Sequence, residues 1–206
     1  MEIINNISKK LKDDLKEEIR FGSKLSIAAT CFSIYAFEEL KDELKKIEEL
    51  RFIFTSPSFT TEKTPKERKE FYIPRFNRER CLTGAEFEIK LRNELLQKAI
   101  ARECADWIRR TVKFKSNTTD ETMMGFMNID DISYTPITGF TTAELGCEKG
   151  NNAYSMINKF ESPVSNEYIK LFNSLWKSDK MEDVTDKVIE SISMAYKENP
   201  LPLSIL

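Results

Sequence analysis

The sequence of 206 residues contains no histidine. The absence of imidazole excludes Ser-His-Asp and Cys-His catalysis, a histidine nucleophile and histidine-liganded metal sites. None of the six glycines precedes a Lys-Ser or Lys-Thr pair, so the chain lacks the phosphate-binding loop of ATP-driven motors. The 32 basic and 34 acidic side chains give a formal charge of −2, which provides no global attraction to nucleic acid or membrane. A nucleic acid or a membrane would therefore have to bind a local patch of positive charge.

Cysteine is scarce and widely spaced. No Cys-x-x-Cys pair occurs, which argues against a zinc ribbon or a thioredoxin-like site, and we expect no metal and no cofactor. The longest uncharged stretch, residues 25–37, is shorter than the roughly 20 residues of a membrane-spanning helix. We therefore expect a cytoplasmic protein without a membrane segment. The four cysteines are expected to be reduced structural thiols: Cys31, Cys81, Cys104 and Cys147.

Hydrophobic periodicity predicts an alternation of helices and strands. A helix, strand, helix, strand order opens the chain, and its second half has the pattern of a βαβ unit. We expect an α/β fold with a mixed, largely parallel sheet flanked by helices on both faces. The expected helices cover 4–19, 34–47, 86–110, 168–176 and 184–196, and the expected strands cover 24–32, 50–54, 112–115, 122–129 and 132–138.

Periodicity disappears between residues 60 and 85, where the composition becomes polar. Seven basic and three acidic side chains in residues 63–80 are interleaved with Phe71, Tyr72 and Phe76. Cations contact phosphates and aromatic rings stack on bases, so this pattern indicates DNA binding; the alternative is a loop whose aromatic residues fold back onto the core. The candidate DNA-binding residues are Lys63, Lys66, Arg68, Lys69, Arg75, Arg78 and Arg80.

Two pairs of adjacent acids are candidates for metal or acid–base chemistry: Asp130 with Asp131, and Glu38 with Glu39. Each pair also has a structural interpretation. Asp-Asp between two strands is typical of a hairpin turn, and Glu-Glu on a charged helix face is typical of a solvated surface. We favour the structural interpretation for both pairs.

Three segments together resemble phospholipase-D-like domains: Leu25-Ser-Ile-Ala-Ala-Thr-Cys-Phe-Ser with the helix and strand that follow, Ile137-Thr-Gly-Phe-Thr-Thr-Ala-Glu-Leu-Gly146, and Tyr168-Ile-Lys-Leu-Phe-Asn-Ser-Leu-Trp176. The arrangement looks most like the N-terminal phospholipase-D-like domain attached to bacterial Swi/Snf-type DNA helicases. The resemblance implies one domain over residues 1–180 with a basic insertion at about 60–85. Residues 181–206 would then be a C-terminal helix and tail leading toward a helicase motor domain.

Active members of that family use His-x-Lys-x4-Asp, in which histidine is the nucleophile and lysine holds the phosphate. The resemblance places Met124 at the histidine position and Phe126 at the lysine position, and the closing motif is shortened at Gly139. A thioether and a phenyl ring neither attack phosphorus nor neutralise phosphate. The resemblance therefore implies the fold and contradicts the hydrolytic activity.

The expected function is that of a catalytically inactive accessory domain of an ATP-dependent helicase, which binds DNA backbone or docks the motor domain or a second copy. Family members commonly face one another across the active motif, and Met124, Phe126 and Met127 would suit an apolar contact if they are exposed. Burial of these residues in the strand is the outcome we favour. Two alternatives are a divergent metal-dependent phosphodiesterase or nuclease, and a protein-interaction module without nucleic-acid binding.

Overall fold

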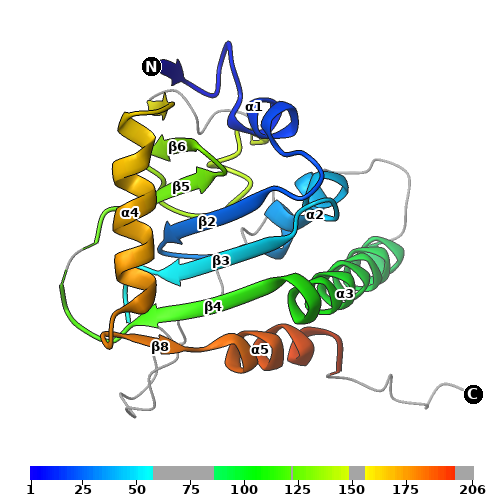
Figure 1. The fold of residues 1–206 in the computed structure, drawn as a ribbon. Helices are drawn as coiled ribbons and strands as arrows, with labels where there is room; N and C mark the ends of the chain where they lie inside the picture. Colours follow the sequence, from blue (N-terminus) through cyan, green and yellow to red (C-terminus); the bar gives the residue numbers. More distant parts are fainter. Residues whose placement is uncertain (58–85, 122, 149–155, 198–206) are drawn as a thin grey trace, which may run out of the picture.

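The computed structural model of the protein describes residues 1–57, 86–121, 123–148 and 156–197, and the described side chains exclude those of 86–95 and 194–197. Helices and strands alternate along most of this chain (Figure 1). The elements are β1 (Glu2–Ile4), α1 (Leu11–Glu18), β2 (Lys24–Ala29), α2 (Ile34–Leu44), β3 (Glu49–Phe54), α3 (Glu86–Thr111), β4 (Val112–Asn117), β5 (Phe126–Ile129), β6 (Ile132–Thr135), β7 (Ile157–Phe160), α4 (Val164–Lys177), β8 (Met181–Asp183) and α5 (Thr185–Lys197).

The described strands form one mixed sheet in the order β1-β7-β6-β5-β2-β3-β4-β8. Only β2–β3 and β3–β4 are parallel, and the other neighbouring pairs are antiparallel. The prediction of a mixed α/β fold is confirmed, but the prediction of a largely parallel sheet is wrong. Helices α2 and α3 connect the parallel strands. The hairpin β5–β6 pairs antiparallel, and so do the short strands β1, β7 and β8, which the sequence pattern did not indicate; β1 and β8 are the two edges of the sheet.

Helices cover both faces of the sheet, as predicted. Alternate residues of β2 point to opposite faces of the sheet. Ile27 and Ala29 lie on what we call the back face, in the core formed with α1, α2, α3 and α5. Ala28 lies on what we call the front face, in the smaller core formed with α4. Figure 1 shows α4 crossing the front face alone. β8 and α5, which follow the proposed boundary at residue 180, pair with β4 and contribute Val188 to the back-face core.

The N-terminal segment differs from the predicted helix over 4–19. Ile4 lies in β1, where it pairs with Ile157 of β7, and α1 begins only at Leu11. Asn6, with a φ of 57°, accepts a hydrogen bond from the Leu11 amide at 2.8 Å through its side chain. An asparagine that bonds nearby backbone competes with helix formation, so the helical spacing of the apolar residues did not extend the helix to residue 4.

The predicted turn between the hairpin strands is confirmed. Asp130 adopts a φ of 50°, which Asp tolerates better than most residues, and its carboxylate accepts a hydrogen bond from the Lys24 amide at 2.9 Å. The turn thereby also joins the hairpin to the start of β2. The strands themselves, β5 and β6, are shorter than the predicted ranges 122–129 and 132–138.

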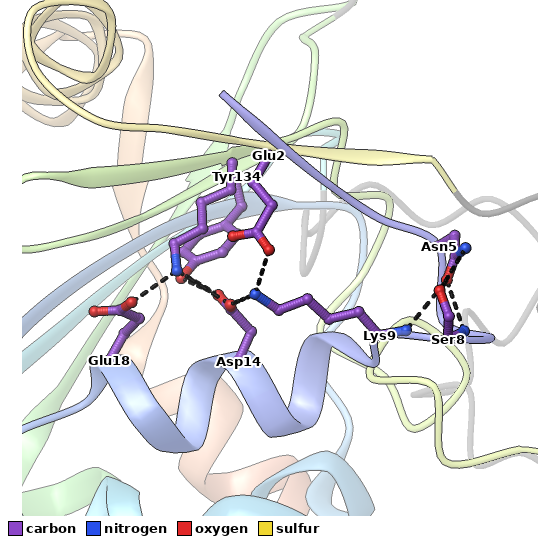
Figure 2. Close-up of polar contacts among 8 residues, drawn as sticks. Glu2, Asn5, Ser8, Lys9, Asp14, Glu18 and Tyr134 are labelled. Carbon is purple, nitrogen blue, oxygen red and sulfur yellow. Dashed lines mark hydrogen bonds and ion pairs between the residues drawn. The ribbon is translucent and has the colours of Figure 1, made fainter.

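A buried ionic network attaches α1 and β1 to the sheet (Figure 2). Asp14 of α1 is fully buried and lies 2.6 Å from the ammonium of Lys9 and 3.0 Å from that of Lys159 on β7. The hydroxyl of Tyr134 on β6 donates to the same carboxylate at 2.8 Å. Lys159 also pairs with Glu18 at 2.7 Å. The network therefore connects three separate parts of the chain around one buried carboxylate.

Hydrogen bonding determines the charge state of Asp14. Burial by itself would raise the pKa of this carboxyl, but the hydrogen bonds from Lys9, Tyr134 and Lys159 outweigh burial and hold the pKa below its usual range. Asp14 is therefore ionised at neutral pH inside the protein, where a charge without partners would be strongly unfavourable.

Asp14→Ala should lower the free energy of unfolding by about 3 kcal/mol, because it leaves the buried Lys159 without its central partner. The exposed neighbour Asp13 provides a control: Asp13→Ala should change the free energy of unfolding by less than about 0.5 kcal/mol. Urea denaturation at pH 7 measures both. Since the pKa of Asp14 is lower in the folded than in the unfolded chain, its contribution is present above about pH 4 and is lost as the pH falls through the folded pKa. Equal effects of the two variants would contradict this role.

Candidate functional site

The candidate site lies where the parallel strands end. β2, β3 and β4 finish at the same edge of the sheet, which we call the carboxyl edge, and ligands of open α/β sheets commonly bind outside such an edge. Thr30 and Cys31 follow β2 there, and Thr55 follows β3. Asn117, at the end of β4, is buried and donates to the Thr55 carbonyl at 3.3 Å. The ends of β3 and β4 are therefore joined by a buried hydrogen bond at this edge.

The segment that resembles the closing motif packs directly against the end of β2. Both the amide and the hydroxyl of Thr30 donate to the Thr138 carbonyl, at 2.9 and 2.8 Å, and the Phe140 amide donates to the Cys31 carbonyl at 2.9 Å. A Cβ on Gly139 would lie 2.7 Å from the Cys31 sulfur. A side chain at position 139 would therefore have to displace the Cys31 thiol, whereas the nearest backbone atom, the Cys31 carbonyl oxygen, would lie at an ordinary contact distance of 3.6 Å.

The residues at the resembled histidine and lysine positions have different environments. Phe126, in β5, is only 2% exposed, and its ring centroid lies 5.5 Å from that of Tyr168 and 6.2 Å from that of Phe172. Met124 precedes the strand and is 67% exposed. Met127 is buried in the back-face core. Of the three residues considered for an apolar contact surface, only Met124 is available on the surface.

Gly125, between Met124 and Phe126, is also constrained by packing. A Cβ at this position would lie 1.8 Å from the Ile137 carbonyl oxygen and 3.0 Å from that of Ala28. Backbone atoms cannot yield as a flexible side chain can, so β5 approaches the segment that follows β6 too closely for any side chain here. The polypeptide is therefore tightly packed at the motif positions.

Burial also shapes the electrostatics of the carboxyl edge. It raises the pKa of the Cys31 thiol, which is therefore protonated at neutral pH and a poor nucleophile. Burial likewise raises the pKa of Glu144, although the Thr138 amide donates to this carboxylate at 3.2 Å. Neither group has the lowered pKa of an activated nucleophile. Within the described ranges, no cluster of three or more acidic or cysteine side chains is arranged to hold a metal ion.

The two acid pairs lie away from this edge or in ion pairs. Asp130 and Asp131 form the hairpin turn beside the amino end of β2, and they line an open hollow of about 510 Å³. Glu38 pairs with Lys41 at 2.9 Å. Glu39 forms an ion pair with Lys12 of α1. These contacts agree with the structural interpretation of both pairs.

The candidate DNA-binding residues lie outside the described residues, as does Cys81: these are Lys63, Lys66, Arg68, Lys69, Arg75, Arg78 and Arg80. β3 ends at Phe54, and the description stops at Pro57. The last described residue before this stretch, Pro57, follows the carboxyl end of β3.

Sequence reasoning missed one feature of α4. The predicted helix over 168–176 contains Leu171, whose 47% exposure the sequence did not indicate, and Val164 at the observed start of α4 is 48% exposed. The two residues are seven positions apart and lie on the same side of the helix. This seven-residue spacing was the available signal, but spacing alone does not distinguish a buried apolar stripe from an exposed one.

A comparison with models of known protein families finds no match, and a comparison with curated proteins finds none. None of the helices in the described part of the chain combines the length and apolar character needed to cross a membrane.

Two alanine substitutions separate the packing roles of neighbouring motif positions. Phe126→Ala should lower the free energy of unfolding by about 4 kcal/mol because it leaves a cavity beneath α4. Met124→Ala, at an exposed side chain, should change it by less than about 0.5 kcal/mol. Thermal and urea unfolding monitored by circular dichroism measure the difference. Similar losses for both variants would show that the exposure of Met124 is misassigned.

Proposed function

We propose that the chain is a catalytically inactive phospholipase-D-like accessory domain of a Swi/Snf-type DNA helicase, which binds the DNA backbone through residues 63–80. The observation that carries the loss of hydrolysis is the replacement of the motif residues by Met124 and Phe126, with Phe126 packed beneath α4. The motor domain, in cis or in trans, is the expected partner of this domain.

The chemistry of the replaced positions supports binding without hydrolysis. Phosphodiester cleavage through a covalent intermediate needs a nucleophile and a cation that stabilises the phosphate charge. Met124 provides neither, and the ring of Phe126 is enclosed by Tyr168 and Phe172. Because the whole sequence lacks histidine, no neighbouring imidazole can substitute for the missing nucleophile.

The contacts among the three resembling segments also support the proposal. The βαβ segment contains β2, and the 137–146 segment is hydrogen-bonded to Thr30 and Cys31 at the end of that strand. The third segment lies in α4, which packs against Phe126 of β5. Each of the two later segments thus packs against the β2 segment, as expected for parts of one inherited site.

DNA binding should depend strongly on salt, since a chain with a formal charge of −2 relies on a local cluster of cations. Replacing Arg75, Arg78 and Arg80 together by alanine should reduce the slope of log affinity against log salt by about 2 to 3. Fluorescence anisotropy with single- and double-stranded oligonucleotides between low and physiological salt measures this slope.

The matched control removes three exposed lysines elsewhere: Lys10, Lys16 and Lys46, each replaced by alanine. It has the same net charge as the triple arginine variant and should retain the slope of the unmodified protein. Absence of binding at low salt would contradict the DNA proposal, and equal slopes for the two triple variants would place the contacts outside residues 75–80.

Hydrolysis is tested with DNA and a generic phosphodiester in Mg²⁺ and then in EDTA, and no turnover is expected in either. Asp130→Asn is the informative variant, because an asparagine can keep the positive φ and the hydrogen bond from the Lys24 amide while it removes the charge. Metal-dependent cleavage that disappears in this variant would overturn the proposal in favour of a metal-dependent nuclease.

A further inference from the structure

Helix α4 lies across two neighbouring rows of front-face side chains, where a row is a set of residues in register on adjacent strands. What we call the apolar row consists of Phe126, Ala28 and Ile53, on β5, β2 and β3. What we call the polar row consists of Ser133, Asn128, Ser26 and Arg51, on β6, β5, β2 and β3. A helix that docks on this face must therefore bury polar groups of the sheet together with apolar ones.

The polar row contacts α4 along the length of the helix. The Ser133 hydroxyl donates to the Asn128 amide oxygen at 2.7 Å and lies 3.4 Å from the Ser165 carbonyl of α4. The Asn128 amide lies 3.5 Å from the Tyr168 carbonyl, at the outer limit of a hydrogen bond. At the far end of the row, Arg51 donates to an asparagine side chain of α4 at 3.0 Å. Water can replace each of these partners at little net cost when the helix moves away.

The side chain of Ser165 opposes the docking of α4. Ser165 is fully buried, and its hydroxyl has no hydrogen-bond partner among the described residues. A buried hydroxyl without a partner loses the hydrogen bonds that it makes in water, which costs free energy in the docked state. Separation of α4 from the sheet would return this hydroxyl to water. The polar row and Ser165 thus both lower the free energy needed to open this contact.

Helix α2 on the back face provides a comparison. α2 buries five apolar residues and no polar residue among its 11 residues, whereas α4 buries only Phe172 and Ser165 among its 14. The front-face core is also a separate cluster from the back-face core, because the sheet lies between them. Loss of α4 from the front face would therefore leave the larger core intact, which is the condition for local rather than global opening.

The connections on both sides of α4 lie on the surface. Residues 161–163 join β7 to α4 and are exposed, and residues 178–180 join α4 to β8 and are exposed except for the half-buried Ser178. Neither connection passes through a core. Movement of α4 therefore does not require β7 or β8 to leave the sheet.

We propose that α4 is a cover that opens from the front face as a unit, while the sheet and the back-face helices stay folded. In the open state the apolar row is accessible to solvent and the polar row is hydrated. This conformational change goes beyond the DNA-binding proposal and does not depend on it, because no residue of the basic stretch takes part.

The accessibility of a thiol beneath α4 tests the opening. Ile53→Cys lies in the apolar row of the front face, and Ile27→Cys on the back face is the matched control, since both isoleucines are fully buried and lose the same atoms. Maleimide labelling of the full chain is followed at each cysteine by peptide mass spectrometry. Position 53 should react at least about 100-fold faster than position 27, which reacts only when the back-face core unfolds.

Cys104, fully buried in the back-face core, is an internal reference for global unfolding in both variants. Labelling of position 53 as slow as that of position 27, or as slow as that of Cys104 in the same chain, would overturn the proposal. Both thiols would then become accessible only through global unfolding.

Hydrogen exchange of the unmodified chain measures the same opening without a substitution. Amides of α4 should exchange at least about 100-fold faster than those of α2, and low urea concentrations should change the α4 rates little, because local opening exposes little surface. Exchange of both helices at one rate with one urea dependence would overturn the proposal.

Two serines of α4 test the contribution of the buried hydroxyl. Ser165→Ala removes this hydroxyl, and Ser174→Ala on the exposed side of the same helix is the control for the change in helix propensity. In the Ile53→Cys chain, Ser165→Ala should slow labelling of position 53 at least about fivefold more than Ser174→Ala does, because the closed state no longer buries an unpaired hydroxyl. Equal effects of the two substitutions would overturn the role given to Ser165.

Discussion

The packing of α4 against β5 is the contact on which the front half of the molecule depends. Phe126 meets Tyr168 and Phe172 there, and Ala28 and Ile53 of the adjoining strands complete the layer. Because α4 is the one described helix over this face, each buried ring accounts for a large share of the apolar area removed from water there. The requirement for an apolar residue at position 126 therefore belongs to the packing of α4 on the sheet.

The charged groups that the protein does bury lie on the other side of the sheet. Asp14, Lys9 and Lys159 form a closed set with Tyr134, in which every charge has an opposite partner. Removing Asp14 would leave the buried charge of Lys159 without its central partner, so the set holds α1 on the sheet, and the ion pair of Lys9 with Glu2 extends it to β1. The carboxyl edge, by contrast, carries a protonated thiol and a carboxyl of raised pKa, Cys31 and Glu144. The buried charges of Asp14 and Lys159 thus hold elements together, whereas neither Cys31 nor Glu144 at the carboxyl edge has the lowered pKa of an activated group.

Sequence periodicity was sufficient for the elements that are both long and strongly patterned. The strand predicted over 24–32 and the helix predicted over 34–47 form but end three residues early, at Ala29 and Leu44. The strand predicted over 50–54, the helix predicted over 86–110 and the Asp130 turn appear within one residue of their predicted places. Sequence periodicity did not predict β1, β7 and β8, because a strand of three or four residues is too short to show a period. Such a strand forms only when a neighbouring strand supplies hydrogen bonds. Those short strands form three antiparallel pairs, which together with the two antiparallel pairs of β5 outnumber the two parallel pairs.

The sequence by itself determined that histidine chemistry and phosphate-loop ATP hydrolysis are excluded, since these depend only on which side chains exist. It also determined that the parallel centre of the sheet is buried on both faces, because an apolar run without alternation requires cover on each side. Only the tertiary structure decided that Phe126 is enclosed while Met124 is exposed, and that Leu171 lies on the surface. Exposure depends on which element packs across a residue, and that element, α4, follows β5 by more than thirty residues in the chain.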